Sequence, residues 1–139
     1  MNKILIGLVS FFFVLVLSGR IFLPAILDKE MNPVSHHLPF IVSDKARELH
    51  KTLIIGDWHS DSALWNRDLS KTYDYGHEDI PRMQTGNIAL QMFTTVTKSP
   101  AGQNYNSNET AARDNITALA IVQGWPIKTW TSLTERAIF

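Results

Sequence analysis

The pattern of apolar and polar positions divides the chain into a long apolar N-terminal segment and a mixed remainder. Residues 4–17 carry no charge, and after Arg20 apolar residues resume as far as Leu27. A membrane-spanning helix needs about 20 such residues, and a removable signal peptide needs a small-residue cleavage site, for which Ser18-Gly19 is the candidate. We therefore expect residues 1–27 to be a signal-anchor or a signal peptide, with a buried helix as the remaining alternative.

Shorter patterns follow the apolar segment. Residues 28–51 are polar and marked by proline, and read as a linker followed by a short lead-in helix that Ser43 caps. An apolar run predicts a buried strand over residues 52–57, and a second such run predicts a strand over residues 88–97. Between them, residues 79–87 begin with Asp-Ile-Pro and end with Gly-Asn, which is typical of a short helix.

The C-terminal third is predicted to be helical. Asn108 is expected to cap a helix whose apolar positions recur at helical spacing and which stops at Gly124. Residues 129–139 are expected to form another helix. Strands that alternate with helices indicate an α/β fold with a parallel sheet.

Composition narrows the possible chemistry. The chain has 13 basic and 13 acidic residues, so its net charge gives no reason to expect a nucleic-acid partner. It contains no cysteine, which excludes disulfides and thiolate metal sites. Any metal ligands must therefore be His, Asp or Glu side chains.

The candidate chemistry lies at the end of the first predicted strand. Side chains alternate along a strand, so Asp57, His59 and Asp61 are expected to point the same way at its carboxyl end. An imidazole and a carboxylate two residues apart are a ligand pair that suits zinc. The alternative is that His59 is a buried core histidine and that Asp61 caps the following helix.

Three landmarks in this region resemble a known family. Residues 56–61, Gly-Asp-Trp-His-Ser-Asp, look like the Asp-Gly-His-Asn-Asp signature of the membrane (renal) dipeptidases, which are zinc metallopeptidases. Residues 76–87 resemble the family's His-x-Asp/Asn-Ile/Leu-Pro-x-Leu-x-x-Gly segment, and residues 88–93 resemble its second strand. Trp58 and Ser60 depart from the usual Gly and Asn, but neither departure affects the His or the Asp.

The resemblance implies a fold and a mechanism. It implies that residues 52–139 are the N-terminal portion of a (β/α)8 TIM-type barrel, which typically needs about 250 residues. It also implies that two zinc ions hold a hydroxide that attacks the peptide bond of a dipeptide. His59 and Asp61 would be the first two metal ligands, and Asp57 would orient a ligand or a water molecule.

The resemblance also implies that this chain lacks part of the site. The family uses a bridging glutamate and two further histidines from later strands, and no residue of this chain aligns with them. We therefore expect the chain to be an incomplete barrel, inactive alone, at the membrane or exported, with its catalytic part outside the cytoplasm. Two alternatives remain: another metal-dependent amide or ester hydrolase of the same barrel type, and a non-catalytic membrane-anchored fragment. The sequence does not indicate the substrate's stereochemistry or the oligomeric state.

Overall fold

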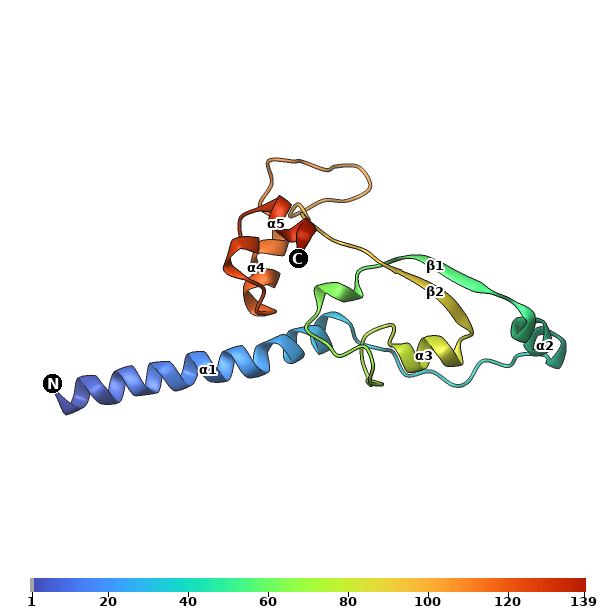
Figure 1. The fold of residues 1–139 in the computed structure, drawn as a ribbon, viewed down its shortest axis with the longest axis horizontal. Coiled ribbons are helices and arrows are strands. Elements are labelled where there is room, and N and C mark those ends of the chain that lie inside the picture. The colour runs from blue at the N-terminus through green and yellow to red at the C-terminus, as the bar shows by residue number, and fades with distance from the viewer. Residues whose placement is uncertain (1) are drawn as a thin grey trace. The chain divides into compact units, whose positions relative to one another are not determined.

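Helices and a small parallel sheet make up the fold in this computed structural model, which describes residues 2–139 (Figure 1). In chain order the elements are α1 (Lys3–Met31), α2 (Asp44–Thr52), β1 (Ile55–Ser60), the 3-10 helix η1 (Ser62–Leu64), α3 (Ile80–Thr85), β2 (Ile88–Phe93), α4 (Asn115–Val122), the 3-10 helix η2 (Ile127–Thr129) and α5 (Leu133–Ile138). The chain divides into two compact units. One contains residues up to Leu27 together with Val96–Phe139, and the other is Asp28–Thr95.

The apolar segment forms one helix of 29 residues, α1, which continues past the expected boundary at residue 27 to Met31. Its most apolar window has a mean hydropathy of 2.4, and none of that window is buried. The helix is long and apolar enough to cross a membrane, as a signal or an anchor would be. The remaining alternative, a buried helix, does not agree with the exposed side chains of this window.

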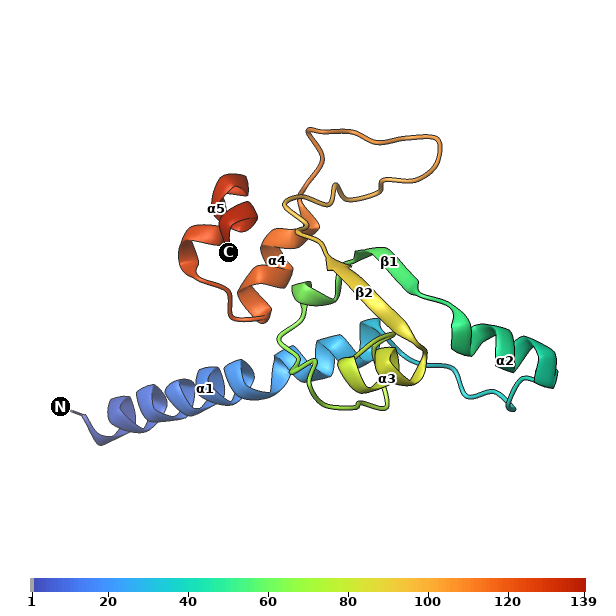
Figure 2. The ribbon, with the colours of Figure 1, turned by 45° about the vertical axis from the view of Figure 1, so that its right-hand side comes forward.

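In the unit Asp28–Thr95, β1 and β2 pair in parallel and the chain between them includes α3, which packs beside β2 (Figures 1 and 2). A parallel pair requires such a crossover. The pairing is irregular. Asp57 pairs with Gln91 and Ser60 pairs with Phe93. Between these two pairs the chain advances by three residues in β1 but by two in β2. This is a β-bulge in β1, and it lies beside the candidate site.

The short helices of this unit begin where the sequence predicts. The Ser43 hydroxyl accepts a hydrogen bond from the Ala46 N–H and caps α2. The Asp79 carboxylate accepts a hydrogen bond from the Arg82 N–H at 2.8 Å and caps α3, which ends before Gly86. The strands differ more from prediction: β1 is Ile55–Ser60 rather than residues 52–57, so Asp57 and His59 lie inside it, and β2 ends at residue 93 rather than 97.

In the other unit, the expected helix start at Asn108 is wrong. Helix α4 begins at Asn115, and Asp114 caps it by accepting hydrogen bonds from the N–H groups of Ile116 and Ser99, both at 3.0 Å. The reason is that the Asp114 carboxylate ties the preceding loop to the helix start, which the weaker Asn108 signal does not. The predicted stop is confirmed: Gly124 follows α4 with a φ of +76°. The last predicted helix, over residues 129–139, is shorter than expected: α5 covers only Leu133–Ile138 and is capped by Ser132, and Thr129 ends the 3-10 helix η2.

A buried arginine organises the end of this unit. The Arg136 guanidinium, with only 1% of its side chain exposed, forms an ion pair with Asp114 at 2.5 Å. It also donates to the carbonyl oxygens of Thr129, Trp130 and Thr97. These bonds hold α5 against the start of α4. Few apolar side chains are buried in this unit: among the described residues they are Pro24, Ile116, Ala120 and Trp125.

Candidate functional site

A pocket of about 280 Å³ lies at the carboxyl end of β1. Its lining residues come from the end of α1, from β1 and η1, and from the loop before α3: they are Asn32, Asp57, His59, Ser60, Asp61, Ser62, Trp65, His77 and Glu78. Three of the acidic residues of the unit line it, and no lysine or arginine does. The pocket is therefore suited to a cation or to a substrate that carries an ammonium group.

Two of the predicted ligands come together at the mouth of this pocket. The His59 Nε2 atom lies 3.3 Å from the Asp61 Oδ1 atom. The His59 side chain is 72% exposed, so it is not a core histidine. Asp61 stands at the start of η1 but makes no side-chain capping hydrogen bond. His59 is therefore not a buried core histidine, and the Asp61 side chain does not cap the following helix.

Asp57 also lines the pocket, but its contact differs from the expected one. Its Oδ1 atom accepts a hydrogen bond from the backbone N–H of His59 at 3.1 Å. This bond, with the neighbouring Gln91 side chain, lowers the pKa of Asp57 below its ordinary value of 3.8. Asp57 thus holds the bulged backbone that presents His59, rather than the imidazole ring.

Asp61 is positioned by the neighbouring strand. The Thr94 hydroxyl lies 2.5 Å from Asp61 Oδ1 and 2.9 Å from the carbonyl oxygen of Ser60. The Thr94 N–H donates to the same Ser60 carbonyl at 2.8 Å. The residue just after β2 therefore fixes the residue just after β1, across the edge of the sheet where the pocket opens.

The sequence did not identify Ser60 and Glu78 as members of the site. Because of the bulge, Ser60 is buried and its hydroxyl donates to the Glu78 carboxylate, while its oxygen accepts the Ser62 N–H. Glu78 lies 18 residues further along the chain, in a loop that returns to the pocket. The polar character of both residues was the available signal, but simple alternation places Ser60 on the other face.

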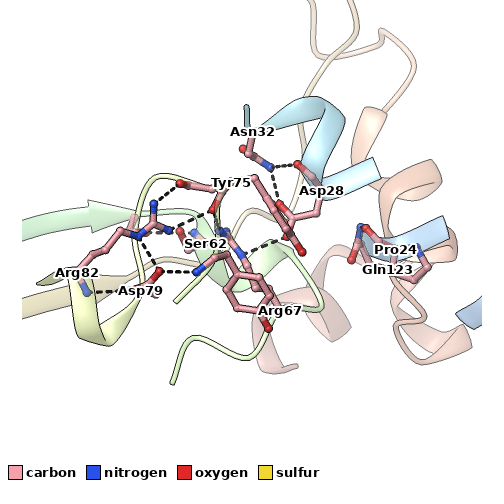
Figure 3. A network of polar contacts seen from close by, with 12 residues as sticks. Pro24, Asp28, Asn32, Ser62, Arg67, Tyr75, Asp79, Arg82 and Gln123 are labelled. Carbon is pink, nitrogen blue, oxygen red and sulfur yellow. Dashed lines mark hydrogen bonds and ion pairs between the residues drawn. The ribbon is translucent and has the colours of Figure 1, made fainter. Parts of the chain in front are cut away.

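Behind the pocket, an ion pair joins the end of α1 to the loop that follows η1 (Figure 3). Arg67 Nε lies 3.1 Å from Asp28 Oδ2, and the two side chains are 2% and 3% exposed. Asn32, which lines the pocket, donates from its amide to Asp28 Oδ1 at 2.8 Å. The end of α1 is therefore part of the structure that supports the pocket.

A second arginine fixes the loop that carries Glu78 (Figure 3). The Arg82 side chain pairs with Asp79 at 2.6 Å and donates to the carbonyl oxygens of Gly76 and Tyr75. Burial raises the pKa of Asp79, but the hydrogen bonds from Arg82 outweigh that effect and the pKa is lowered. The ionised pair thus sets the loop conformation on either side of His77 and Glu78.

The distance between the His59 and Asp61 side chains is that of an ordinary contact between an imidazole and a carboxylate, and it is also close to the spacing of two zinc ligands. Two ligands of a tetrahedral zinc at about 2.0–2.1 Å lie about 3.3–3.4 Å from each other, and the His59 and Asp61 donors are 3.3 Å apart. A catalytic zinc needs three protein ligands. Within residues 2–139, however, no group of three or more His, Asp or Glu side chains is arranged to hold a metal. His59 and Asp61 are therefore a pair of side chains in contact and not a metal site by themselves.

No family model, curated protein or solved structure matches the chain. The resemblance to the membrane dipeptidases therefore rests on the sequence landmarks alone.

Proposed function

We propose that this chain supplies the first two zinc ligands, His59 and Asp61, of a membrane-anchored dipeptidase. The observation that carries the proposal is the 3.3 Å separation of His59 Nε2 and Asp61 Oδ1 at the mouth of a polar pocket. Dipeptides are the proposed substrates because the family landmarks at residues 56–61 and 76–93 belong to dipeptidases. The acidic lining of the pocket suits the free amino group of such a substrate.

The fold supports a barrel as the setting. In (β/α)8 barrels the catalytic groups lie at the carboxyl ends of parallel strands, which is the position of this pocket relative to β1. Parallel sheets are normally covered on both faces, yet Trp58 and Met92 of this sheet are 72% and 45% exposed. We propose that β1 and β2 are the first two strands of a larger barrel that covers these side chains.

Each residue of the pocket has a proposed role. His59 and Asp61 hold the metal, which when bound polarises the scissile carbonyl and acidifies a water molecule. Thr94 orients the Asp61 carboxylate, and Asp57 fixes the backbone of His59. Such supporting partners keep ligands in place and are costly to remove. At least one further ligand must come from outside the pair.

The proposal is tested by zinc content and dipeptide hydrolysis in the full-length enzyme. We expect His59→Ala and Asp61→Ala each to lower the bound zinc and to reduce turnover by at least about a thousandfold, since a metal-assisted hydrolysis loses its main source of charge stabilisation. His50→Ala is the matched control, because His50 is an exposed residue near the end of α2 and does not line the pocket.

Folding must be checked by circular dichroism, since an unfolded variant would also lose zinc. Full zinc stoichiometry and unchanged activity in folded His59→Ala would show that the assignment is wrong. Zinc binding that depends on His59 and Asp61 but is accompanied by no hydrolysis of dipeptides would favour the other two interpretations. Hydrolysis of other amides would then indicate a different hydrolase of the same barrel type, and its absence would indicate a binding protein.

A further inference from the structure

Arg20 interrupts the apolar segment of α1, and the structure gives it a partner. Its Nη1 atom makes a long hydrogen bond, 3.5 Å, to the carbonyl oxygen of Ile121, one of the last carbonyls of α4. A cation at the carboxyl end of a helix is favourable because the helix dipole is negative there. Arg20 therefore acts as a cap for α4 supplied by a different element of the same compact unit.

Two neighbouring contacts strengthen this junction. Pro24 is buried inside α1, and its carbonyl oxygen accepts a hydrogen bond from the buried Gln123 amide at 3.3 Å. Gly124 follows with a φ of +76°, and a Cβ atom there would lie 3.4 Å from the Arg20 guanidinium. The turn requires this glycine because of its positive φ, whereas a Cβ atom would meet the guanidinium only at ordinary van der Waals distance.

We infer that Arg20 marks the edge of the bilayer: residues 4–19 of α1 lie in the hydrocarbon, and α1 leaves it from residue 20 onward, where Arg20 and Pro24 bond to Ile121 and Gln123. This inference rests on the membrane anchor proposed above and is independent of zinc chemistry. Its partner is a lipid bilayer, because the side chains of residues 4–17 are exposed and apolar with no protein group covering them.

The length of α1 requires that part of it leaves the hydrocarbon. A helix of 29 residues is about 44 Å long at 1.5 Å per residue, against a hydrocarbon thickness of about 30 Å. Residues 4–19 alone span about 24 Å, and the long Lys3 and Arg20 side chains, which reach the two surfaces from the ends of this stretch, allow a hydrocarbon segment shorter than about 20 residues. The C-terminal end carries Asp28, Lys29 and Glu30, whereas the other end carries Lys3 alone. The C-terminal end is therefore the one that lies outside.

The position of the edge follows from the junction. If Arg20 lay in the hydrocarbon, the end of α4 and the loop Gln123-Gly124 would lie there too. Irregular backbone exposed to lipid is not tolerated in the hydrocarbon, since its polar groups lack partners. The edge must therefore fall on the N-terminal side of Arg20. The exposed Phe22 and Ile26 then lie among the headgroups, where apolar side chains are accepted.

The absence of native cysteine allows a direct test. Single cysteines are placed at Phe12 and Ile26, which are 66% and 54% exposed, in the full-length chain in open membrane sheets. The probe is a charged maleimide. It reacts with the thiolate form of cysteine, which does not form in hydrocarbon. We expect Ile26→Cys to react at least about tenfold faster than Phe12→Cys.

The role of Arg20 is tested in the Ile26→Cys chain. Arg20→Leu extends the apolar segment, so the helix should slide inward and labelling should slow to the rate of Phe12→Cys. Arg20→Lys keeps a charge at the edge and should leave labelling fast. Slow labelling of Ile26→Cys with Arg20 intact would overturn the inference, as would fast labelling that Arg20→Leu leaves unchanged. Fast labelling at both positions would refute the anchor itself, whatever zinc measurements show.

Discussion

At the scale of single residues, the candidate site depends on one hydroxyl that belongs to neither proposed ligand. Thr94 lies just after β2 and contacts both the Asp61 carboxylate and the Ser60 carbonyl. A carboxylate can bind a metal through several geometries, and a fixed hydrogen bond selects one of them. The Thr94 hydroxyl thus aims Asp61 toward the His59 imidazole.

We predict that Thr94→Val weakens zinc binding about 10- to 100-fold, which is the usual effect of removing a group that orients a metal ligand. Valine matches threonine in shape and β-propensity, so the strand should be kept. Thr94→Ser retains the hydroxyl and is expected to bind zinc within about threefold of the natural chain. Competition with a chelator of known affinity measures the zinc affinity of the natural chain and of both variants. Equal zinc affinities for Thr94→Val and the natural chain would contradict the prediction.

The residues of the candidate site could be predicted from the sequence only in part. The apolar run predicted a strand next to His59 and Asp61, but the strand is Ile55–Ser60 and not residues 52–57. Ser60 could not be placed, because alternation puts it on the opposite face. The bulge between Asp57 and Ser60 changes the alternation, and it depends on pairing with β2, which a local pattern does not encode.

At the scale of elements, caps decided which predicted boundaries are correct. Ser43 and Asp79 lie directly before their helices, and the helices begin there. For α4 the sequence pattern predicted Asn108 as the cap, whereas the structure uses Asp114, whose role depends on tertiary contacts. Asp114 accepts hydrogen bonds from two backbone N–H groups and pairs with the buried Arg136, so the helix begins after it.

Asp114 should make stability depend on pH. Burial raises its pKa, but hydrogen bonds from Ser99, Arg136 and Ile116 lower it from 3.8 to about 2. A carboxyl whose pKa is lowered in the folded state stabilises the fold above its unfolded value and loses that effect as the pH falls toward the folded value. We predict that the unfolding free energy decreases between about pH 4 and pH 2 because Asp114 becomes protonated.

The test compares the natural chain with Asp114→Asn and with Asp44→Asn. Asp44 is the matched control, because its side chain is 97% exposed in its ion pair. Denaturant unfolding followed by tryptophan fluorescence should give a smaller pH dependence for Asp114→Asn and an unchanged one for Asp44→Asn. If Asp114→Asn keeps the full decrease between about pH 4 and pH 2, the group responsible is a different one.

At the scale of the whole molecule, the sequence predicted the kinds of element but not the contacts between distant ones. The apolar helix, the parallel strands and the crossover helix follow from periodicity and turn residues. The partners of Arg20, Asp28 and Arg67 do not, because each lies far from its partner in sequence or in an apparent linker. Residues 28–31, expected to begin the linker, are the last turn of α1 and carry a buried carboxylate.

That carboxylate leads to a prediction about how the anchor helix and the pocket depend on each other. Asp28→Ala leaves the Arg67 guanidinium buried without its ion pair, which typically costs about 3–5 kcal/mol. The neighbouring Lys29→Ala removes an ion pair with Asp74 whose side chains are 57% and 76% exposed, and such pairs contribute about 0–1 kcal/mol. We therefore expect a large loss of stability for Asp28→Ala and almost none for Lys29→Ala.

The loss should reach the pocket, because Asn32 donates to Asp28, and Arg67 donates to the Tyr75 carbonyl in the loop that leads to Glu78. Hydrogen exchange of residues 67–82 should become faster in Asp28→Ala, and zinc affinity should fall with it. Asp28→Leu combined with Arg67→Met replaces the pair by apolar groups and should recover most of the stability. If Asp28→Ala exchanges and binds zinc like Lys29→Ala, the end of α1 does not support the pocket and acts only as a tether.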